Sequence, residues 1–272
     1  MEYYKCDSGI LRCGDCKDVM GSFEDNYIDL TVTSPPYDNL RDYKGYSFDF
    51  EGIAKELFRV TKDGGVVVWI VGDETRNFGE SLTSFRQALY FNEIGFKLLD
   101  TMIYLKKCYP PAYPNLKRYA GVFEYMFILL KGKRPKIFNP LMEDKSLASM
   151  KDGAVSGYRQ KDGSVIKKKI FSMGKKKQKT NVWEYLPGRH SGEDIKKFLH
   201  PATFPNELAK DHILSWSNEG DTVFDPFTGS GTTLKMAERL GRKWIGIEMS
   251  EEYCEIAKAR IEHEREQLKM DF

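Results

Sequence analysis

The sequence predicts a doubly wound α/β fold, and three observations support this prediction. Short apolar strands alternate along the chain with stretches of helical periodicity, as in a sheet covered by helices. The run Val66-Val67-Val68-Trp69-Ile70-Val71 has no polar alternation, which is typical of a central strand in a parallel sheet. A Gly229-Ser230-Gly231 turn lies between a predicted strand and a predicted helix. With 272 residues, one large domain that carries an insertion is expected.

Residues 1–130 are predicted to form the first half of this domain. Apolar strands alternate here with helical patterns. The segment Lys62-Asp63-Gly64-Gly65 is expected to be a turn, because paired glycines favour a change of chain direction. In chain order, the predicted elements are strands at 9–13 and 28–33, a helix at 50–59, a strand at 65–71, a helix at 81–94, and strands at 97–105 and 125–130.

The regular pattern is lost over residues 131–180, where Gly, Lys and Ser predominate. Only weak strand signals, at 164–166 and 170–171, interrupt this composition, so an insertion is predicted here. Residues 181–272 return to regular order and are predicted to complete the same domain. Their predicted elements are a helix at 206–216, a strand at 222–225, a helix at 232–240, a strand at 243–248 and a helix at 251–268.

Charge is distributed unevenly along the chain. The formal net charge is only +2, but residues 131–180 contain fifteen Lys or Arg and four Asp or Glu. The remainder of the chain is therefore mildly acidic. A basic segment on an acidic body is suited to a polyphosphate partner such as nucleic acid, and the alternative is a solvated Lys-rich loop.

Composition also argues against several classes of protein. The first residues lack the basic start and apolar core of a signal peptide, and no apolar run is long enough to cross a bilayer. We therefore expect a cytoplasmic protein with no membrane partner. Five irregularly spaced cysteines favour reduced thiols. The Cys13-Gly-Asp-Cys16 pair has no second pair or nearby histidine, and no helix start is expected after it, so neither a metal nor a redox site is predicted.

The segment Asp225-Pro-Phe-Thr-Gly-Ser-Gly-Thr-Thr233 predicts a ligand-binding turn. Gly229 and Gly231 permit positive φ and close approach of a ligand to the N–H groups of the helix start. Neither a third fingerprint glycine nor a Gly-Lys-Thr sequence follows, so pyrophosphate and triphosphate fit poorly. Asp225 would attract an ammonium group, and Glu248, at the end of the next strand, suits ribose hydroxyls. These features favour S-adenosylmethionine, and the alternative is a tight turn without a ligand.

The segment Ser34-Pro35-Pro36-Tyr37 follows the strand predicted at 28–33 and favours binding of a planar amine. The two prolines remove two N–H donors, so nearby carbonyl groups form an edge of acceptors. The Ser34 hydroxyl adds an acceptor and Tyr37 a flat ring, so the segment could hold the –NH₂ of a nucleobase and stack on it. A proline-rich strand stop with a packed tyrosine is the structural alternative.

Together the two segments resemble the signatures of the amino-group DNA methyltransferases. The family's catalytic tetrapeptide corresponds to Ser34-Pro35-Pro36-Tyr37, and its cofactor turn corresponds to Asp225-Pro226-Phe227-Thr228-Gly229-Ser230-Gly231-Thr232. The catalytic motif precedes the cofactor motif, with a basic stretch between them, and this order is similar to that of the beta class. The resemblance implies a Rossmann-like methyltransferase sheet with a circularly permuted motif order. It also implies that residues 131–180 form the target-recognition region.

The resemblance implies roles for individual residues. Asp15 resembles the family's adenine-contacting strand end, and Phe204 belongs to a segment that lines the methionine side of the cofactor pocket. Catalysis is assigned to Ser34, Pro35, Pro36 and Tyr37. Cofactor binding is assigned to Asp15, Phe204, Asp225, Pro226, Phe227, Gly229, Ser230, Gly231, Thr232 and Glu248. DNA contact through phosphate is expected of Lys117, Arg118, Lys167, Lys168, Lys169, Lys175, Lys176 and Lys177.

The predicted activity is methyl transfer from S-adenosylmethionine to the N4 amine of a cytosine flipped out of duplex DNA, within a restriction-modification system. Family members with Ser at the first motif position, here Ser34, are generally cytosine-N4 enzymes, whereas those with Asp are generally adenine-N6 enzymes. Adenine-N6 methylation is the first alternative. An RNA amino-methyltransferase and a catalytically silent nucleic-acid-binding module are further alternatives. A separate restriction endonuclease and a second copy of the chain are the other partners considered.

Overall fold

The computed structural model describes residues 1–36, 48–108, 117–145, 154–170, 175–187 and 204–270. The chain divides into two compact units, and we describe each by itself. The larger unit comprises residues 1–139 and 181–272, and the smaller unit comprises residues 140–180.

A mixed sheet forms the centre of the larger unit, and its described part has nine strands in the order β1-β2-β15-β14-β3-β4-β8-β7-β13. The five strands from β2 to β4 are parallel to one another, whereas β1 and β8 run antiparallel to their neighbours. The strands span Glu2–Lys5 (β1), Gly9–Cys13 (β2), Lys243–Glu248 (β15), Thr222–Asp225 (β14), Ile28–Thr33 (β3), Thr61–Val71 (β4), Phe123–Leu130 (β8), Lys97–Lys106 (β7) and Val182–Tyr185 (β13).

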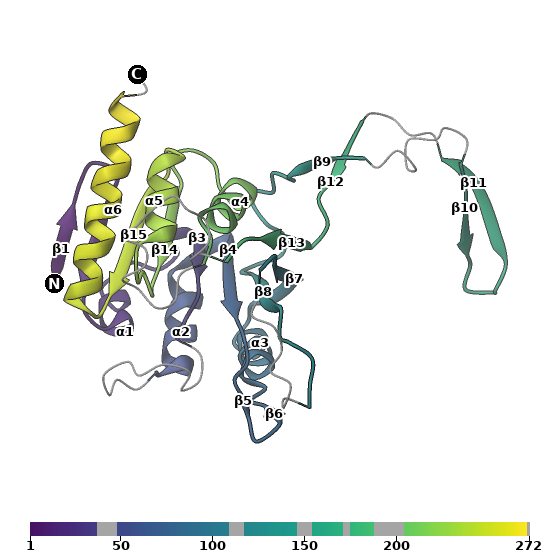
Figure 1. Cartoon of the computed structure of the whole chain (residues 1–272), viewed down its shortest axis with the longest axis horizontal. Coiled ribbons are helices and arrows are strands. Elements are labelled where there is room, and N and C mark those ends of the chain that lie inside the picture. Colours follow the sequence, from purple (N-terminus) through teal and green to yellow (C-terminus); the bar gives the residue numbers. More distant parts are fainter. Residues whose placement is uncertain (37–47, 109–116, 146–153, 171–174, 188–203, 271–272) are drawn as a thin grey trace. The chain divides into compact units, whose positions relative to one another are not determined.

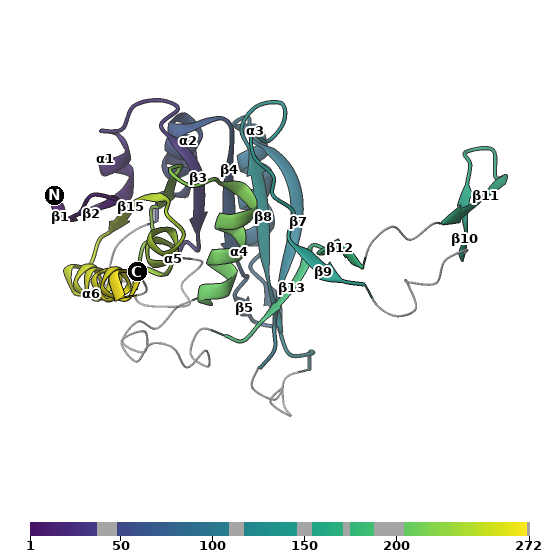
Figure 2. The same ribbon diagram turned by 90° about the horizontal axis from the view of Figure 1, so that it is seen from above.

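Helices cover both faces of this sheet, which confirms the predicted α/β class. Figure 2 shows α1, α2 and α3 on one face and α4, α5 and α6 on the other. A short hairpin of β5 and β6 connects β4 to α3. The helices span Cys16–Met20 (α1), Phe50–Val60 (α2), Thr83–Glu93 (α3), Asn206–Trp216 (α4), Thr232–Arg239 (α5) and Glu251–Met270 (α6), and the hairpin strands span Thr75–Arg76 (β5) and Gly79–Glu80 (β6).

The two sequence halves meet in one continuous sheet. β15 pairs in parallel with β2, with Glu248 opposite Cys13. β14 pairs in parallel with β3, with Phe224 opposite Thr31. The two strands contributed by residues 222–248 therefore lie between two strands contributed by residues 9–33.

An aromatic cluster fills the core between the sheet and the helices α2 and α3. Trp69 of β4 is fully buried, and its ring lies 5.0 Å from that of Phe91. The Trp69 indole N–H donates to Gln87 Oε1 at 2.8 Å, so its polar atom is paired inside the core. The continuous apolar run in β4 is thus a buried central strand, as the sequence predicts, but the strand is parallel only to β3 and runs antiparallel to β8.

Two local predictions were wrong. β4 begins at Thr61, so the segment 62–65 belongs to the strand instead of forming a turn before it. A hydrogen bond from the Gly64 N–H to the Lys131 carbonyl holds this segment in the strand. The pairing with β3 accommodates it through a register shift between Ile28 and Leu30. A helix start does follow the Cys13-Gly-Asp-Cys16 pair, because the Asp15 side chain accepts from Lys17 N and Asp18 N and so caps α1.

The smaller unit consists of two antiparallel strand pairs in its described part. β10 (Ala154–Arg159) pairs with β11 (Val165–Ile170), and β9 (Met142–Asp144) pairs with β12 (Lys176–Gln178). Across the described residues of the chain, we find no helix with the length and apolar character that a membrane span requires.

Candidate active site

The end of β3 lies beside the end of β14, so the predicted catalytic and cofactor segments begin at the same sheet edge. The Thr33 hydroxyl donates to Asp225 Oδ1 at 2.6 Å, and both side chains are buried. Ser34 and Pro36 are half-buried and Pro35 is buried. Tyr37 lies outside the described residues. The sheet thus brings two segments 192 positions apart in the chain into direct contact.

The Asp225 carboxylate is 1% exposed. It accepts hydrogen bonds from the Thr33 hydroxyl, from Phe227 N at 3.0 Å and from the Thr233 hydroxyl. Burial raises the pKa of Asp225 to about 6, and these three hydrogen bonds only partly offset the effect. A positively charged group beside Asp225 would stabilise its ionised form.

The glycines of the turn are required by backbone conformation and by packing. Gly229 and Gly231 have φ of 50° and 78°, which a residue with a Cβ adopts only with strain. A Cβ on Gly231 would lie 2.9 Å from the Cβ of Ala257, so α5 and α6 could not pack as closely. Pro226, Ser230 and Thr232 are buried around this turn. The turn is therefore a rigid part of the fold.

Glu248 connects this turn to the start of α6. One carboxylate oxygen accepts from Gly229 N at 2.8 Å, and the other accepts from Ser250 N at 2.9 Å. Burial raises the pKa of Glu248, and the backbone donors lower it in part. Asp15 follows β2, the strand next to β15, so its carboxylate lies at the same sheet edge as that of Glu248.

Two aromatic residues complete the predicted cofactor set. The Phe227 ring lies 5.6 Å from the ring of Phe48 and 6.2 Å from that of Trp69, so it anchors the turn to the aromatic core. Phe204 is half-buried and directly precedes Pro205, the N-cap of α4.

Arg260 was not predicted, although it contacts the turn directly. Its guanidinium donates to the Ser230 carbonyl, to the Ser230 hydroxyl at 2.9 Å and to the Thr232 hydroxyl at 3.3 Å. A further bond reaches Asn206 Oδ1 of α4 at 3.4 Å. The side chain is buried on the apolar face of α6, between Ile256 and Ile261 in the sequence. An arginine among the apolar residues of this helix was the available signal.

The predicted DNA-contacting residues differ in their surroundings. Lys117, Lys167, Lys175 and Lys176 are exposed. Lys177 is also exposed and lies 3.0 Å from Glu143. Arg118 donates to Glu80 at 2.9 Å and to the Thr75 hydroxyl, so its guanidinium is engaged within the larger unit. The side chains of Lys168 and Lys169 lie outside the described part of the structure.

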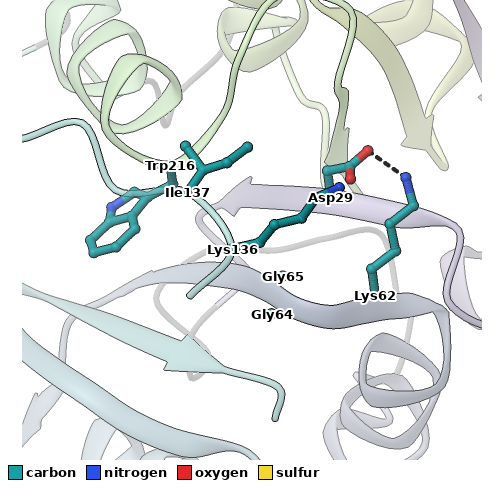
Figure 3. Close-up of a pocket in the computed structure, with 7 residues that line it drawn as sticks. All are labelled: Asp29, Lys62, Gly64, Gly65, Lys136, Ile137 and Trp216. Atoms are coloured by element: carbon teal, nitrogen blue, oxygen red, sulfur yellow. Dashed lines mark hydrogen bonds and ion pairs between the residues drawn. The ribbon is translucent and has the colours of Figure 1, made fainter. Parts of the chain in front are cut away.

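A small pocket lies at the opposite end of β3. Its lining includes Asp29, near the start of β3, and Lys62, and Figure 3 shows their charged groups pointing toward one another, 2.7 Å apart. Asp29 also accepts from Thr222 N at 3.1 Å. The pocket is therefore separate from the edge that carries Ser34 and Asp225. Among the described side chains, no cluster of three or more His, Cys, Asp or Glu is arranged to hold a metal ion.

Comparison with known proteins agrees with this arrangement. Residues 28–259 match the N6/N4 family described as DNA methylase. The chain is 53% identical over 240 residues to the orphan methyltransferase M.BamHII of Bacillus amyloliquefaciens, covering 87% of this chain and 89% of that protein.

Two solved structures have the same fold. The cytosine-N4-specific PvuII DNA methyltransferase superimposes with a TM-score of 0.70 at 22% identity, covering 95% of this chain and 88% of that one. The Thermus thermophilus protein TTHA0409, in complex with S-adenosyl-L-methionine, superimposes with a TM-score of 0.61 at 26% identity, covering 93% and 95%. The chain therefore belongs to the N6/N4 family of DNA methylases, enzymes that depend on S-adenosylmethionine.

Proposed function

We propose that this chain methylates the N4 amine of a cytosine that is flipped out of duplex DNA. The observation that carries the proposal is the buried hydrogen bond between Thr33 and Asp225. It joins the residue before the Ser34-Pro35-Pro36-Tyr37 segment to the first residue of the glycine turn. A methyl donor held by the turn and an amine held at Ser34 would then lie within reach of one another.

The residues of the turn fit S-adenosylmethionine. Asp225 is a buried carboxylate with a raised pKa, and its described hydrogen-bond donors are all neutral, so an ammonium group is the partner it lacks. We assign Glu248 to the ribose hydroxyls and Asp15 to the adenine. Phe204 would line the methionine side, and the closely packed Pro226–Thr232 turn would fix the position of the ligand. Bound S-adenosylmethionine supplies an electrophilic methyl group on its sulfonium.

The catalytic segment would orient the amine. The hydroxyl of Ser34 and the carbonyl oxygens near Pro35 can accept both hydrogens of an exocyclic –NH₂, because the prolines have no N–H donors to compete. These two bonds favour a more tetrahedral nitrogen with an available lone pair. In the transfer the sulfur–methyl bond would break as the nitrogen–methyl bond forms, and the methylated nitrogen would then release one proton to solvent. We assign Tyr37 to stacking on the extruded base. Positioning and electrostatics would provide the acceleration.

Cytosine is proposed because Ser34 stands at the first position of the motif. The same geometry could hold the N6 amine of adenine, so the base must be identified directly. The experiment is to methylate unmodified bacteriophage DNA with the pure protein, digest the DNA to nucleosides and identify the methylated nucleoside by mass spectrometry. We expect N4-methylcytosine. The appearance of N6-methyladenine instead would refute the assignment of Ser34, and methyl transfer to folded RNA alone would refute the DNA substrate.

The partners of the enzyme remain predictions. The proposal requires duplex DNA, and the basic 131–180 region is proposed to contact its phosphates and read the site. The relative at 53% identity is described as an orphan methyltransferase. A restriction enzyme encoded beside this chain, and a homodimer, can be sought by co-expression and by measuring mass in solution.

A further inference from the structure

The β5–β6 hairpin carries a phenylalanine in an unfavourable backbone conformation. Thr75 pairs with Glu80 and Arg76 pairs with Gly79, which leaves Asn77 and Phe78 as the two central residues of the turn. Their φ values are 51° and 65°, both in the left-handed region. Two-residue hairpins of this kind favour Asn-Gly, because glycine adopts positive φ without strain. A bulky aromatic residue at the second position is therefore an outlier.

Burial does not explain the presence of Phe78, because its side chain is 79% exposed. A residue whose backbone is strained and whose ring is exposed to water contributes little to the stability of the free protein. Such residues are found where a ligand is to be contacted, so a binding role for the ring is indicated.

The hairpin lies at the same sheet edge as the catalytic segment. β4 is parallel to β3, with Trp69 opposite Thr33, so both strands end at the edge occupied by Ser34. The hairpin begins four residues after β4 and continues beyond its end, as Figure 1 shows. Asp73 fixes its base by accepting from the Ser81 hydroxyl at 3.1 Å and from Ser84 N at 2.9 Å.

Arg118 braces the hairpin from a second segment. Its guanidinium donates to the Thr75 hydroxyl on β5 and to the Glu80 carboxylate on β6. The next residue, Tyr119, is 97% exposed. The hairpin and residues 117–119 thus present two exposed aromatic rings. We call these two segments together the aromatic rim.

The charges of the aromatic rim favour bases over phosphates as its partner. The three cationic side chains of the aromatic rim are matched in number by Glu80 within it and by two acidic residues at the base of the hairpin; the charged residues are Arg76, Lys117, Arg118, Glu80, Asp73 and Glu74. A surface of this kind gains little from phosphate neutralisation, whereas base–aromatic stacking does not depend on net charge.

We propose that Phe78 inserts against the base stack of DNA and stabilises the duplex while the target base is extruded, and that Arg118 is a positioning residue for it. This inference rests on the proposed function. Extrusion requires unstacking of the target base, and an apolar ring at the opened step can replace part of the lost stacking. Arg118 would then act through the hairpin and not as a phosphate contact.

The test uses the full chain and a duplex that contains its methylation site, mapped by sequencing DNA that the enzyme has modified. Phe78→Gly removes the ring and relieves the positive φ, and Phe78→Trp retains a stacking ring. Leu89→Ala, at a 65% exposed position on α3, is the matched control. Methyl transfer is measured on the fully paired duplex and on a duplex with an abasic position opposite the target, where extrusion is already easy.

We expect Phe78→Gly to lose about tenfold in kcat/KM on the paired duplex and much less on the abasic duplex. Its melting temperature should equal or exceed that of the wild type, whereas a structural role would lower it. Phe78→Trp and Leu89→Ala should have the kcat/KM of the wild type on both duplexes. Arg118→Ala should lose kcat/KM on the paired duplex as Phe78→Gly does. The inference is overturned if Phe78→Gly loses nothing or loses equally on both duplexes. A wild type that methylates no DNA would instead refute the proposed function.

Discussion

Asp225 illustrates how a single residue can link ligand binding to stability. Its carboxylate is buried, and its described hydrogen-bond donors are the neutral groups of Thr33, Phe227 and Thr233. The pKa is raised from 3.8 to about 6, so the folded protein favours the protonated carboxyl. The stabilisation from this preference is complete below the usual pKa and is lost as pH rises through about 6. At neutral pH the free protein therefore holds an unfavourable charge.

We expect Asp225→Asn to be more stable than the wild type at neutral pH and to bind S-adenosylmethionine more weakly. Relative to the wild type, the free energy of unfolding of the variant should increase by up to about 3 kcal/mol between pH 4 and pH 7. Urea unfolding at several pH values measures it. Asp7→Asn, at an exposed carboxylate, is the control. A pH-independent difference would contradict this account of Asp225.

Ser34 gives a second prediction at the scale of one residue. Ser34→Ala removes the hydroxyl acceptor, so kcat should fall by about 10- to 100-fold while the dissociation constant for S-adenosylmethionine stays unchanged. Ser34→Asp retains an acceptor and should keep more activity than the alanine variant. Transfer of a labelled methyl group and calorimetric titration provide the two measurements. An alanine variant as active as the wild type would exclude a role for this hydroxyl.

The backbone of the glycine turn was predictable from residue type, because Gly229 and Gly231 permit the positive φ that both adopt. The role of the turn in cofactor binding stays a prediction. Asp225, Gly229 and Gly231 stand out from the sequence alone, since few other functions combine a carboxylate with two glycines at a strand end. Arg260 could not be assigned, because only the fold brings the Ser230 carbonyl to that position of α6. Phe78 was missed because its significance depends on a φ value.

At the scale of elements, α6 and α4 hold the glycine turn through Arg260. The guanidinium donates to Ser230 and Thr232 in the turn and to Asn206 in α4. Because Ser230 and Thr232 are buried, loss of the donor removes buried hydrogen bonds to the turn. The position of the turn should therefore depend on this side chain.

We predict that Arg260→Met lowers the free energy of unfolding by about 3 kcal/mol and weakens S-adenosylmethionine binding. Arg260→Lys should recover part of the affinity, because one ammonium can still donate to the turn. Arg265→Lys is the matched control, since Arg265 lies on the same helix and donates to Ser8 and Glu238. Equal effects at Arg260 and Arg265 would argue against a specific role in the turn.

Element type was easier to predict than strand direction. Helices and strands of the larger unit were identified by periodicity and by apolar runs. The antiparallel pairing of β4 with β8 was not predicted, because a buried strand has the same composition whether it runs parallel or antiparallel to its neighbour. The strands β1 and β13 at the two ends of the sheet were not predicted, because each has four residues that mix polar with aromatic side chains.

On the scale of the whole molecule, the basic residues of the 140–180 unit are predicted to determine the salt dependence of DNA binding. Substituting Lys167, Lys175 and Lys176 by Gln should reduce the slope of log K against log salt by about 3. S-adenosylmethionine binding should not change. Filter binding at several salt concentrations measures the slope. The control substitutes three exposed lysines outside this unit, Lys55, Lys97 and Lys210, and an equal reduction there would contradict the prediction.

The insertion of β14 and β15 between β2 and β3 has a consequence for biosynthesis. The ribosome produces β2 and β3 early, yet their neighbours in the sheet are translated about two hundred residues later. Until then both nascent strands have open edges, which are prone to misassociation. Catalytic competence can arise only when translation has passed Glu248, and chaperone occupancy of the nascent chain should be highest before that point.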